Sequence, residues 1–289
     1  MDAPPGGATT VALPTDAPAD LRRRFEAAVP FPHVVLDDVL DLAPATVVAE
    51  FPTEQWPGWT RYRDEYQRGK LTCNDLAAMP PLLRELTREL GEPAFLRFLE
   101  GVTGIDGLVP DPYLEGGGLH AGATGATLTP HTDFHVYPRL GLFRRVNVLL
   151  YLNPGWQHDD GGALELFDPN AVTTSDGDTD AVTAVDPVFG RMVIFRTDDR
   201  SPHGFTDPIA DGRYRRSLAL YYYTSTEAPE FSGDTNTYWK THGTTTTSSR
   251  RVRLATYRTL LTGSRALSML AHRCNPNLGS RLRPERPDA

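Results

Sequence analysis

The residues with the clearest chemical potential are two histidines and an aspartate in two short motifs. His-Thr-Asp-Phe-His occupies positions 131–135, and Ser-Pro-His-Gly occupies positions 201–204. Residues i and i+2 of a strand lie on the same face, so His131 and Asp133 can reach a common ion. Together with His203, from a distant strand, they supply the two imidazoles and one carboxylate of a facial triad, which holds Fe(II) and leaves coordination positions open.

This metal site has an ordinary alternative, in which all three residues are surface or core side chains. A lone His-x-Asp is a weak signal, but two motifs that both lie in a strand context are a stronger one. Three protein ligands without a fourth are typical of a catalytic rather than a structural site. The sequence therefore predicts a catalytic metal centre formed by His131, Asp133 and His203.

A strand predicted at 213–223 offers a site for a carboxylate. Its alternation places Arg215, Ser217 and Ala219 on one face, while Arg216 shares the other face with leucines. The leucine face should pack into apolar material, so Arg216 is expected to point away from the pocket. Arg215 is then expected to pair with a carboxylate through two hydrogen bonds, and Ser217 to add a hydroxyl. A surface salt bridge is the alternative for Arg215.

Tyr151, on a predicted strand at 145–153, could donate a hydrogen bond to the same carboxylate. A buried structural tyrosine is an almost equal alternative, because buried tyrosines usually satisfy their hydroxyl groups.

Further side chains are expected near the mouth of the pocket. The predicted substrate contacts are His135, Tyr137, Arg139 and Trp156. His135 is expected either to touch substrate or to hydrogen-bond next to the metal ligands. Tyr137 and Trp156 could form an apolar wall or merely pack the loop. The arginines near the predicted strand ends are Arg139, Arg144, Arg145 and Arg196. They could attract an anionic molecule, but solvated charges are the favoured interpretation.

The elements that must position these residues are mainly strands. Strands are predicted at 31–37, 126–134, 145–153, 163–167, 191–197 and 215–223. Helices are predicted at 41–51 and at 80–101, where Gly91-Glu92-Pro93 splits the pattern in two. Several short strands separated by turn residues favour a sandwich or jelly roll, with the helices packed on its outside.

The overall composition limits the possible partners and location. The formal charge of −8 gives a nucleic-acid partner no support. No stretch is apolar enough to span a membrane, and no secretory signal is evident. Two cysteines 201 residues apart form no motif, which fits a reducing cytoplasm. The oligomeric state is left open.

The chain is expected to hold one catalytic domain. The predicted divisions are a flexible leader at 1–20, a jelly-roll domain at 21–240, a helical C-terminal extension at 241–274 and a flexible tail at 275–289. The polar connection at 168–187 is either an insertion without function or a flap over the pocket.

The ordered motifs of 131–223 resemble the prolyl-4-hydroxylase-type branch of the Fe(II)/2-oxoglutarate dioxygenases. The matching pieces are HTDF at 131–134, RVNVLLYLNPGW at 145–156, GGALELF at 161–167, GRMVIF at 190–195, SPHGF at 201–205 and RRSLALYYY at 215–223. The resemblance implies a double-stranded β-helix with Fe(II), 2-oxoglutarate and O2 as cofactor and co-substrates. It also implies that His131, Asp133 and His203 bind iron, and that Arg215, with Tyr151 as partner, binds 2-oxoglutarate.

The function expected from these features is hydroxylation of an unactivated C–H in a small metabolite or amino-acid-derived molecule, within a biosynthetic pathway. Desaturation and cyclisation use the same apparatus and stay open. The alternatives are a peptidyl (prolyl-type) hydroxylase, a non-enzymatic cupin-like binding barrel and a zinc-dependent hydrolase.

Overall fold

The computed structural model describes residues 10–14, 18–64, 66–170, 180–226 and 237–239, and a few positions between 252 and 267. The chain divides into two compact units, Met1–Gly243 and Thr244–Ala289. The fold below is that of the first unit. The second unit, which includes most of the predicted C-terminal extension and the tail, lies almost wholly outside the described residues.

The larger of two sheets contains nine strands, with a main path of β1–β11–β8–β13–β5–β3–β2. Its strands are β1 (His33–Leu36), β2 (Thr60–Arg61), β3 (Lys70–Cys73), β4 (Val109–Pro110), β5 (Gly118–Gly122), β7 (Val136–Tyr137), β8 (Leu142–Tyr151), β11 (Met192–Arg196) and β13 (Arg215–Thr224). Neighbouring strands pair antiparallel, and the ten-residue strands β8 and β13 lie side by side at the centre.

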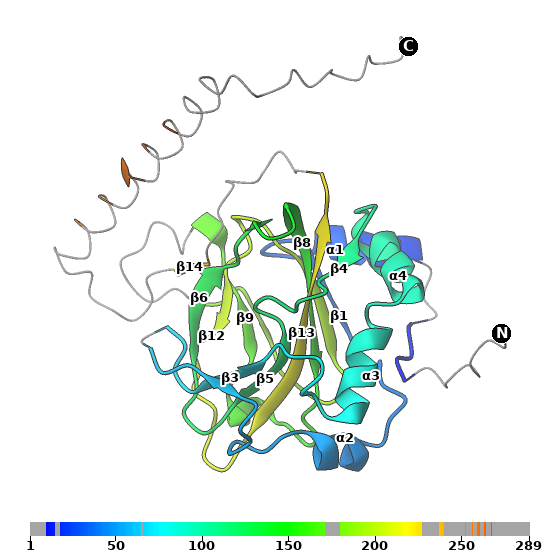
Figure 1. The fold of residues 1–289 in the computed structure, drawn as a ribbon, viewed down its shortest axis with the longest axis vertical. Helices are drawn as coiled ribbons and strands as arrows, with labels where there is room; N and C mark the ends of the chain where they lie inside the picture. The colour runs from blue at the N-terminus through cyan, green and yellow to red at the C-terminus, as the bar shows by residue number, and fades with distance from the viewer. Residues whose placement is uncertain are drawn as a thin grey trace, which may run out of the picture. The chain divides into compact units, whose positions relative to one another are not determined.

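The smaller sheet contains five strands in the order β10–β9–β12–β6–β14. Its strands are β6 (Leu128–Thr132), β9 (Leu164–Leu166), β10 (Thr183–Val185), β12 (His203–Phe205) and β14 (Tyr238–Trp239). Apolar residues of both sheets meet in one cluster, in which Tyr151, Val193 and Phe195 contact Leu164 and Leu166. The two sheets therefore face each other (Figure 1), and the predicted jelly roll with outer helices is confirmed.

Four helices cover the outer face of the larger sheet (Figure 1). They are α1 (Pro18–Ala27), α2 (Pro44–Glu50), α3 (Pro81–Glu89) and α4 (Pro93–Thr103). Proline stands in the first turn of α2, α3 and α4, where its missing N–H costs no hydrogen bond. α4 ends at Gly104, whose φ of 68° is the left-handed conformation that glycine adopts easily.

Side chains of β13 alternate between the core beneath the helices and the space between the two sheets. Leu218, Leu220 and Tyr222 belong to the main core beneath the helices. Arg216 lies on that same side, over the rings of Phe51 and Tyr214. The other face of the strand is therefore left for the space between the sheets, as the sequence predicted.

Ordered structure begins before the predicted boundary at residue 21. Val11 is buried, bridges to Leu40, and its N–H donates to the carboxylate of Glu89. The sequence analysis also missed the hairpin of β2 and β3, because strands of two and four residues leave little periodic signal. Of the connection at 168–187, positions 171–179 lie outside the described residues.

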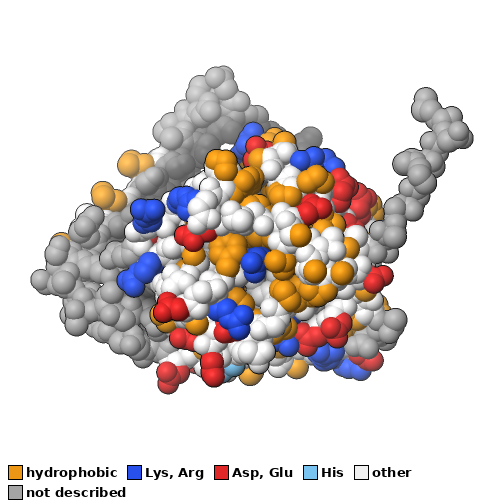
Figure 2. Space-filling view, turned by 90° about the horizontal axis from the view of Figure 1, so that it is seen from below, with side chains coloured by type: hydrophobic (Ala, Val, Ile, Leu, Met, Phe, Trp, Pro, Cys, Tyr) orange, Lys and Arg blue, Asp and Glu red, His pale blue; other side chains and the backbone are white. Residues whose placement is uncertain are grey.

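Charges on the surface are mixed. On the face drawn in Figure 2, basic side chains are interspersed with acidic ones and do not gather into one large field. Within the part of the chain that is described, no helix combines the length and apolar character needed to cross a bilayer.

Candidate active site

The two histidines of the predicted triad are brought together by the smaller sheet. His131 on β6 and His203 on β12 are direct cross-strand partners, and their ring centroids lie 4.5 Å apart. Gly204 allows this pairing, because a Cβ there would lie 2.6 Å from the carbonyl oxygen of Leu128. Asp133 follows directly after β6 and lies on the same side as His131.

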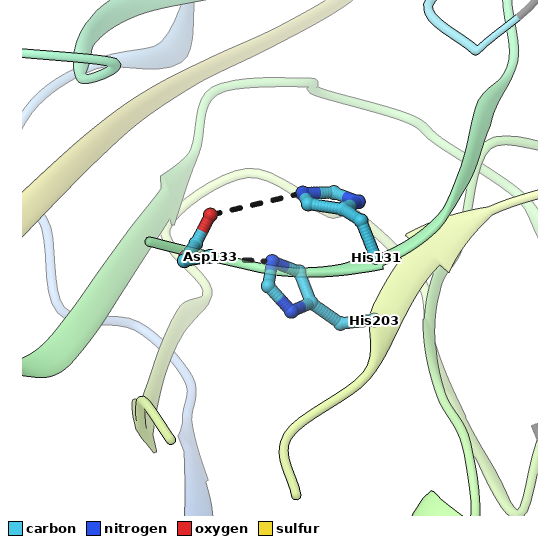
Figure 3. Close-up of side chains that lie close together, drawn as sticks. All are labelled: His131, Asp133 and His203. Carbon is cyan, nitrogen blue, oxygen red and sulfur yellow. Dashed lines mark ion pairs between the residues drawn. The ribbon is translucent and has the colours of Figure 1, made fainter. Parts of the chain in front are cut away.

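All three side chains converge on one point (Figure 3). The Nε2 atom of His131 lies 3.8 Å from Oδ1 of Asp133, and the Nε2 atom of His203 lies 3.8 Å from Oδ2. One ligand atom from each residue lies within 4.8 Å of the others, and all three residues are buried. Two donor atoms that each lie about 2 Å from one ion are at most about 4 Å apart, so the two 3.8 Å distances are compatible with a shared ion.

Hydrogen bonds fix the orientation of both rings. Nδ1 of His131 lies 2.9 Å from the carbonyl oxygen of Thr129, and Nδ1 of His203 lies 2.9 Å from that of Ser201. A carbonyl can only accept, so each Nδ1 carries a proton, and Nε2, which lies on the side of Asp133, is the ring nitrogen available to a metal. These are the supporting bonds that metal-binding histidines usually make.

Burial and nearby charges keep His131 and Asp133 deprotonated. Burial lowers the pKa of His131 to about 3, and His203 adds to that effect. Burial alone would raise the pKa of Asp133, but Arg144 and the two histidines outweigh it and lower the pKa to about 2. At neutral pH His131 is therefore a neutral imidazole and Asp133 a carboxylate, the forms that bind a cation.

Arg144 corrects an expectation from the sequence, since it is not a solvated charge. It is 1% exposed, its Nη1 lies 3.4 Å from Oδ2 of Asp133, and its Nη2 donates to the Tyr223 hydroxyl. Its guanidinium stacks between the rings of Phe134 and Tyr221, at 3.7 and 3.6 Å from their centroids. Position near a strand end suggested exposure, and no local signal in the sequence showed that aromatic rings would enclose it.

Arg215 projects from β13 into a narrow cavity of about 50 Å³ between the sheets. Its Nε donates to the Gly162 carbonyl at 2.7 Å, and its Nη2 donates to the Tyr151 hydroxyl at 3.3 Å. Gly162 has a φ of 64°, and a Cβ there would lie 3.1 Å from Arg215, so the Gly161-Gly162 pair is needed for this close approach. The arginine is thus held rigidly by neutral acceptors.

The narrow cavity connects the arginine with the metal site. Its walls include His131, His203, Asn147, Arg215 and Ser217. Tyr151 is fully buried and reaches Arg215 through its hydroxyl, but it does not line the cavity itself. Two residues that the sequence analysis missed, Lys70 and His120, complete the basic lining.

A second, wider cavity of about 560 Å³ opens on the other side of His131 and Asp133. One wall is the β2–β3 hairpin and its flanks, with Thr60, Tyr62, Gln67, Lys70, Thr72 and Asn74. The opposite wall holds Glu115, Phe134, Tyr137, Pro138, Arg144 and Tyr221. Tyr137 is the only predicted substrate contact that lines this cavity.

The other predicted substrate contacts lie elsewhere. His135 is buried, and its Nδ1 lies 3.3 Å from Oδ1 of Asp199, which is not one of the candidate metal ligands. Arg139 stacks on the Tyr113 ring at 3.5 Å, and Trp156 packs against Phe205 and Ile209. None of these three side chains lines either cavity.

The donor set fits the metal and the co-substrate that the motifs imply. Two imidazoles and a carboxylate with open positions are the ligands of non-haem Fe(II) oxygenases. Arg215 is a buried guanidinium with no carboxylate partner among the described residues, so the cavity has a place for an anion. Oδ1 of Asn147, buried in the same cavity, has no hydrogen-bond partner within the described protein, which suits a polar ligand.

Comparison with known proteins agrees with this chemistry. Residues 117–223 match the family model of the 2OG-Fe(II) oxygenase superfamily. This segment includes all three candidate metal ligands and Arg215. No curated protein sequence matches the chain significantly.

Solved structures with a similar fold were also found. A prolyl hydroxylase from Trichoplax adhaerens, in complex with a hypoxia inducible factor peptide fragment, is 19% identical; the alignment covers 70% of this chain and 87% of that one, with a TM-score of 0.48. A Pseudomonas putida prolyl-4-hydroxylase is 20% identical, with coverages of 72% and 98% and a TM-score of 0.43. HygX from Streptomyces hygroscopicus, with nickel, 2-oxoglutarate and hygromycin B bound, is 16% identical, with coverages of 72% and 92% and a TM-score of 0.44.

The family match therefore falls on the segment that contains the buried His-Asp-His cluster and Arg215, the buried arginine that has no carboxylate partner among the described residues. A zinc hydrolase needs no 2-oxoglutarate, so it would not need the buried Arg215 beside the metal-ligand cluster. The match to the 2OG-Fe(II) oxygenase superfamily over residues 117–223, together with the buried His-Asp-His cluster, supports a 2-oxoglutarate-dependent iron dioxygenase.

Proposed function

We propose that His131, Asp133 and His203 bind the Fe(II), and that Arg215 and Ser217 bind the far carboxylate of 2-oxoglutarate in the narrow cavity. The observation that supports this best is that His131 and His203, two of the three clustered metal-ligand residues, line the same narrow cavity as the buried Arg215, which has no carboxylate partner among the described residues. Tyr151 has the supporting role of holding Arg215 in place through its hydroxyl. The primary substrate occupies the wide cavity and is hydroxylated at an unactivated C–H.

When bound, the iron supplies the oxidising chemistry, using O2 and the decarboxylation of 2-oxoglutarate. The residues of this chain do the placement. The hydrogen bonds to Thr129 and Ser201 keep each Nε2 aimed at the metal, and Arg144 holds Asp133 in its ionised form. Arg215 fixes one end of the co-substrate, which limits how its other end can approach the metal.

The substrate proposed is a small molecule. A cavity of about 560 Å³ lies within the size range of sites for small ligands, and it opens directly onto His131 and Asp133. Its walls combine hydroxyl, amide and aromatic groups, which suit a polar metabolite or amino-acid-derived compound. A role in a biosynthetic pathway and a cytoplasmic location stay predictions from the sequence.

Anaerobic optical titration of Fe(II)-loaded protein with 2-oxoglutarate tests the proposed co-substrate site. Bidentate binding of a 2-oxo acid to Fe(II) should produce a visible charge-transfer band that saturates with concentration. Glutarate, which lacks the keto group, is the matched control and should produce none. Absence of the band in protein that has bound iron would contradict the proposed co-substrate site.

A succinate-release screen tests the substrate class. Small polar metabolites and free amino acids should stimulate decarboxylation, whereas proline-containing peptides should not. Stimulation by peptides alone would favour the peptidyl hydroxylase instead.

A further inference from the structure

Lys70 stands where the two cavities meet. It is on β3, pairs with Gly122 on β5, and Gly122 in turn pairs with Arg215 on β13. Lys70 and Arg215 therefore occupy one row of the sheet two strands apart, with their Cα atoms roughly 10 Å from each other. Lys70 lines both cavities, as His131 and Tyr221 also do.

The chain uses lysine very sparingly, which makes this position notable. Only two of its 29 basic residues are lysine, Lys70 and Lys240; the rest are arginine. An ammonium group is a compact point charge with three donors, in contrast to the flat guanidinium.

The ammonium of Lys70 forms no ion pair within 4 Å among the described residues, although the charges of Asp133 and Asp64 act on it from farther away. Its hydrogen bond goes to Oε1 of Gln67 at 3.4 Å, and the ring centroid of Tyr62 lies 5.8 Å away. Burial lowers the pKa of Lys70 to about 8, so the amine is still mostly charged at neutral pH. A half-buried charge paired only with an amide carries a desolvation cost that a bound anion would offset.

The immediate neighbours of the amine place it on the substrate side. Gln67 and Tyr62 line the wide cavity and not the narrow one. Thr72 and Asn74 follow Lys70 at i+2 and i+4 and line the same wall. The amine therefore belongs to a row of hydrogen-bonding groups that faces the wide cavity.

A count of charges indicates that 2-oxoglutarate is not the anion that pairs with Lys70. Ferrous iron with Asp133 has one net positive charge, and adding Arg215 balances the two negative charges of 2-oxoglutarate. Arg144, which lies against Oδ2 of the same aspartate, adds one further positive charge, so the site carries an excess of positive charge even before Lys70 is counted. Glu115, the other acid that lines the wide cavity, is exposed, so no carboxylate of the cavity wall forms an ion pair with Lys70.

We propose that Lys70 binds an oxyanion of the primary substrate, a carboxylate or a phosphate, in the wide cavity. This inference rests on the proposed function, because it takes the narrow cavity as the 2-oxoglutarate site. The substrate class then narrows from a small polar molecule to a small acid, whose anionic group lies against the β2–β3 hairpin while its reacting carbon faces the metal.

Amine labelling tests the proposal on the full-length protein with Fe(II) and 2-oxoglutarate under anaerobic conditions. The acetylation rates of Lys70 and Lys240 are measured by peptide mass spectrometry, with Lys240 as internal control for the reagent. Saturating 2-oxoglutarate should change the Lys70 rate by less than twofold. Sodium sulfate or sodium acetate, added on top, should slow it at least threefold relative to sodium chloride of equal ionic strength.

The two anions separate the possible groups, because sulfate has the tetrahedral shape of a phosphate and acetate is a carboxylate. Strong protection by 2-oxoglutarate alone would assign the amine to the co-substrate and overturn the proposal. Lack of protection by both anions would overturn it too. Protein that gives no charge-transfer band with 2-oxoglutarate would instead contradict the proposed function, so the two failures are distinguishable.

Substitutions give a second, independent measurement. Lys70→Gln and Lys70→Arg should bind 2-oxoglutarate within threefold of the wild type in the optical titration. Arg68→Gln, which removes an exposed cation from the same hairpin, is the matched control for lost charge. A loss of 2-oxoglutarate affinity above tenfold in Lys70→Gln, with Arg68→Gln unchanged, would overturn the assignment to the substrate.

Discussion

The narrow and wide cavities share His131, Lys70 and Tyr221, but the rest of their walls differ in structure. The narrow cavity lies between long or paired strands, and its arginine is buried and fixed by a carbonyl and a phenol. The wide cavity has a short hairpin and loops in its walls besides strand residues, and several of its polar side chains are half-buried or exposed. Atoms that must hold a constant geometry thus lie on rigid strands, whereas atoms that recognise a particular substrate lie on short elements that tolerate change.

The largest expected effect is at the metal end. Asp133→Ala removes the carboxylate that both imidazoles face, and it should weaken iron binding by more than about a hundredfold, because loss of a supporting group alone costs 10–100-fold. Equilibrium competition with a coloured chelator measures the affinity. Asp64→Ala, an exposed acid outside both cavity walls, is the control and should bind iron normally. Normal affinity in Asp133→Ala would show that the rigid cavity does not hold the metal.

Arg144→Met tests whether the charge of Arg144, which lines the wide cavity, stabilises the folded protein by pairing with Asp133. The change leaves Asp133 buried without its cation, and breaking one side of a buried pair costs about 3 kcal/mol. The loss of unfolding free energy should be smaller in metal-loaded protein, since the ion replaces the missing positive charge. Urea unfolding with and without metal measures both values. Equal losses in the two forms would mean that aromatic stacking, and not the charge on Asp133, is what Arg144 contributes.

Arg215→Ala should affect the co-substrate alone. Charged hydrogen bonds are worth about 1.5–3 kcal/mol, so the 2-oxoglutarate dissociation constant should rise by roughly 10–150-fold while iron affinity stays unchanged. Arg216→Ala is a control on the opposite face of the same strand, where the guanidinium lies over Phe51 and Tyr214. Unchanged 2-oxoglutarate affinity in Arg215→Ala would make the anchor assignment wrong.

The same contrast explains how much the sequence could predict. The metal ligands lie within or beside strands long enough to show alternation, and the face assignment of β13 followed from Leu218 and Leu220 against Ser217 and Ala219. Arg144 and Lys70 gave no comparable signal. Arg144 is buried by rings from two separate segments, Phe134 after β6 and the tyrosines of β13, and Lys70 reaches the site only through a hairpin whose strands are too short to be recognised.

The predicted contacts His135, Arg139 and Trp156 failed to reach either cavity for a related reason. Closeness in sequence to the motifs suggested closeness to the site, but β6 ends at Thr132, a turn follows residue 137, and Trp156 packs against Phe205 and Ile209. Side-chain direction within loops depends on tertiary packing, which one sequence does not encode in a periodic pattern.

The smallest expected effect is a pH dependence that differs between the cavities. His131 has a pKa of about 3 in the folded protein against an ordinary value of 6.5 when unfolded. Between these values the unfolded chain binds more protons, so metal-free protein should lose about 1.4 kcal/mol of unfolding free energy per pH unit as the pH falls below 6.5. His131→Gln should remove this component in urea unfolding between pH 6.5 and 5.

Lys70, with a folded pKa of about 8 against 10.5 when unfolded, affects stability at alkaline pH instead. Its unfavourable contribution to the unfolding free energy is fully present below pH 8 and fades as the pH rises to 10.5. Lys70→Gln should therefore change the slope of the profile only above pH 8, and by less than His131→Gln, because water reaches the half-buried amine; below pH 8 it should shift the unfolding free energy by a constant amount. A change of slope at acid pH in Lys70→Gln would contradict this division between the two cavities.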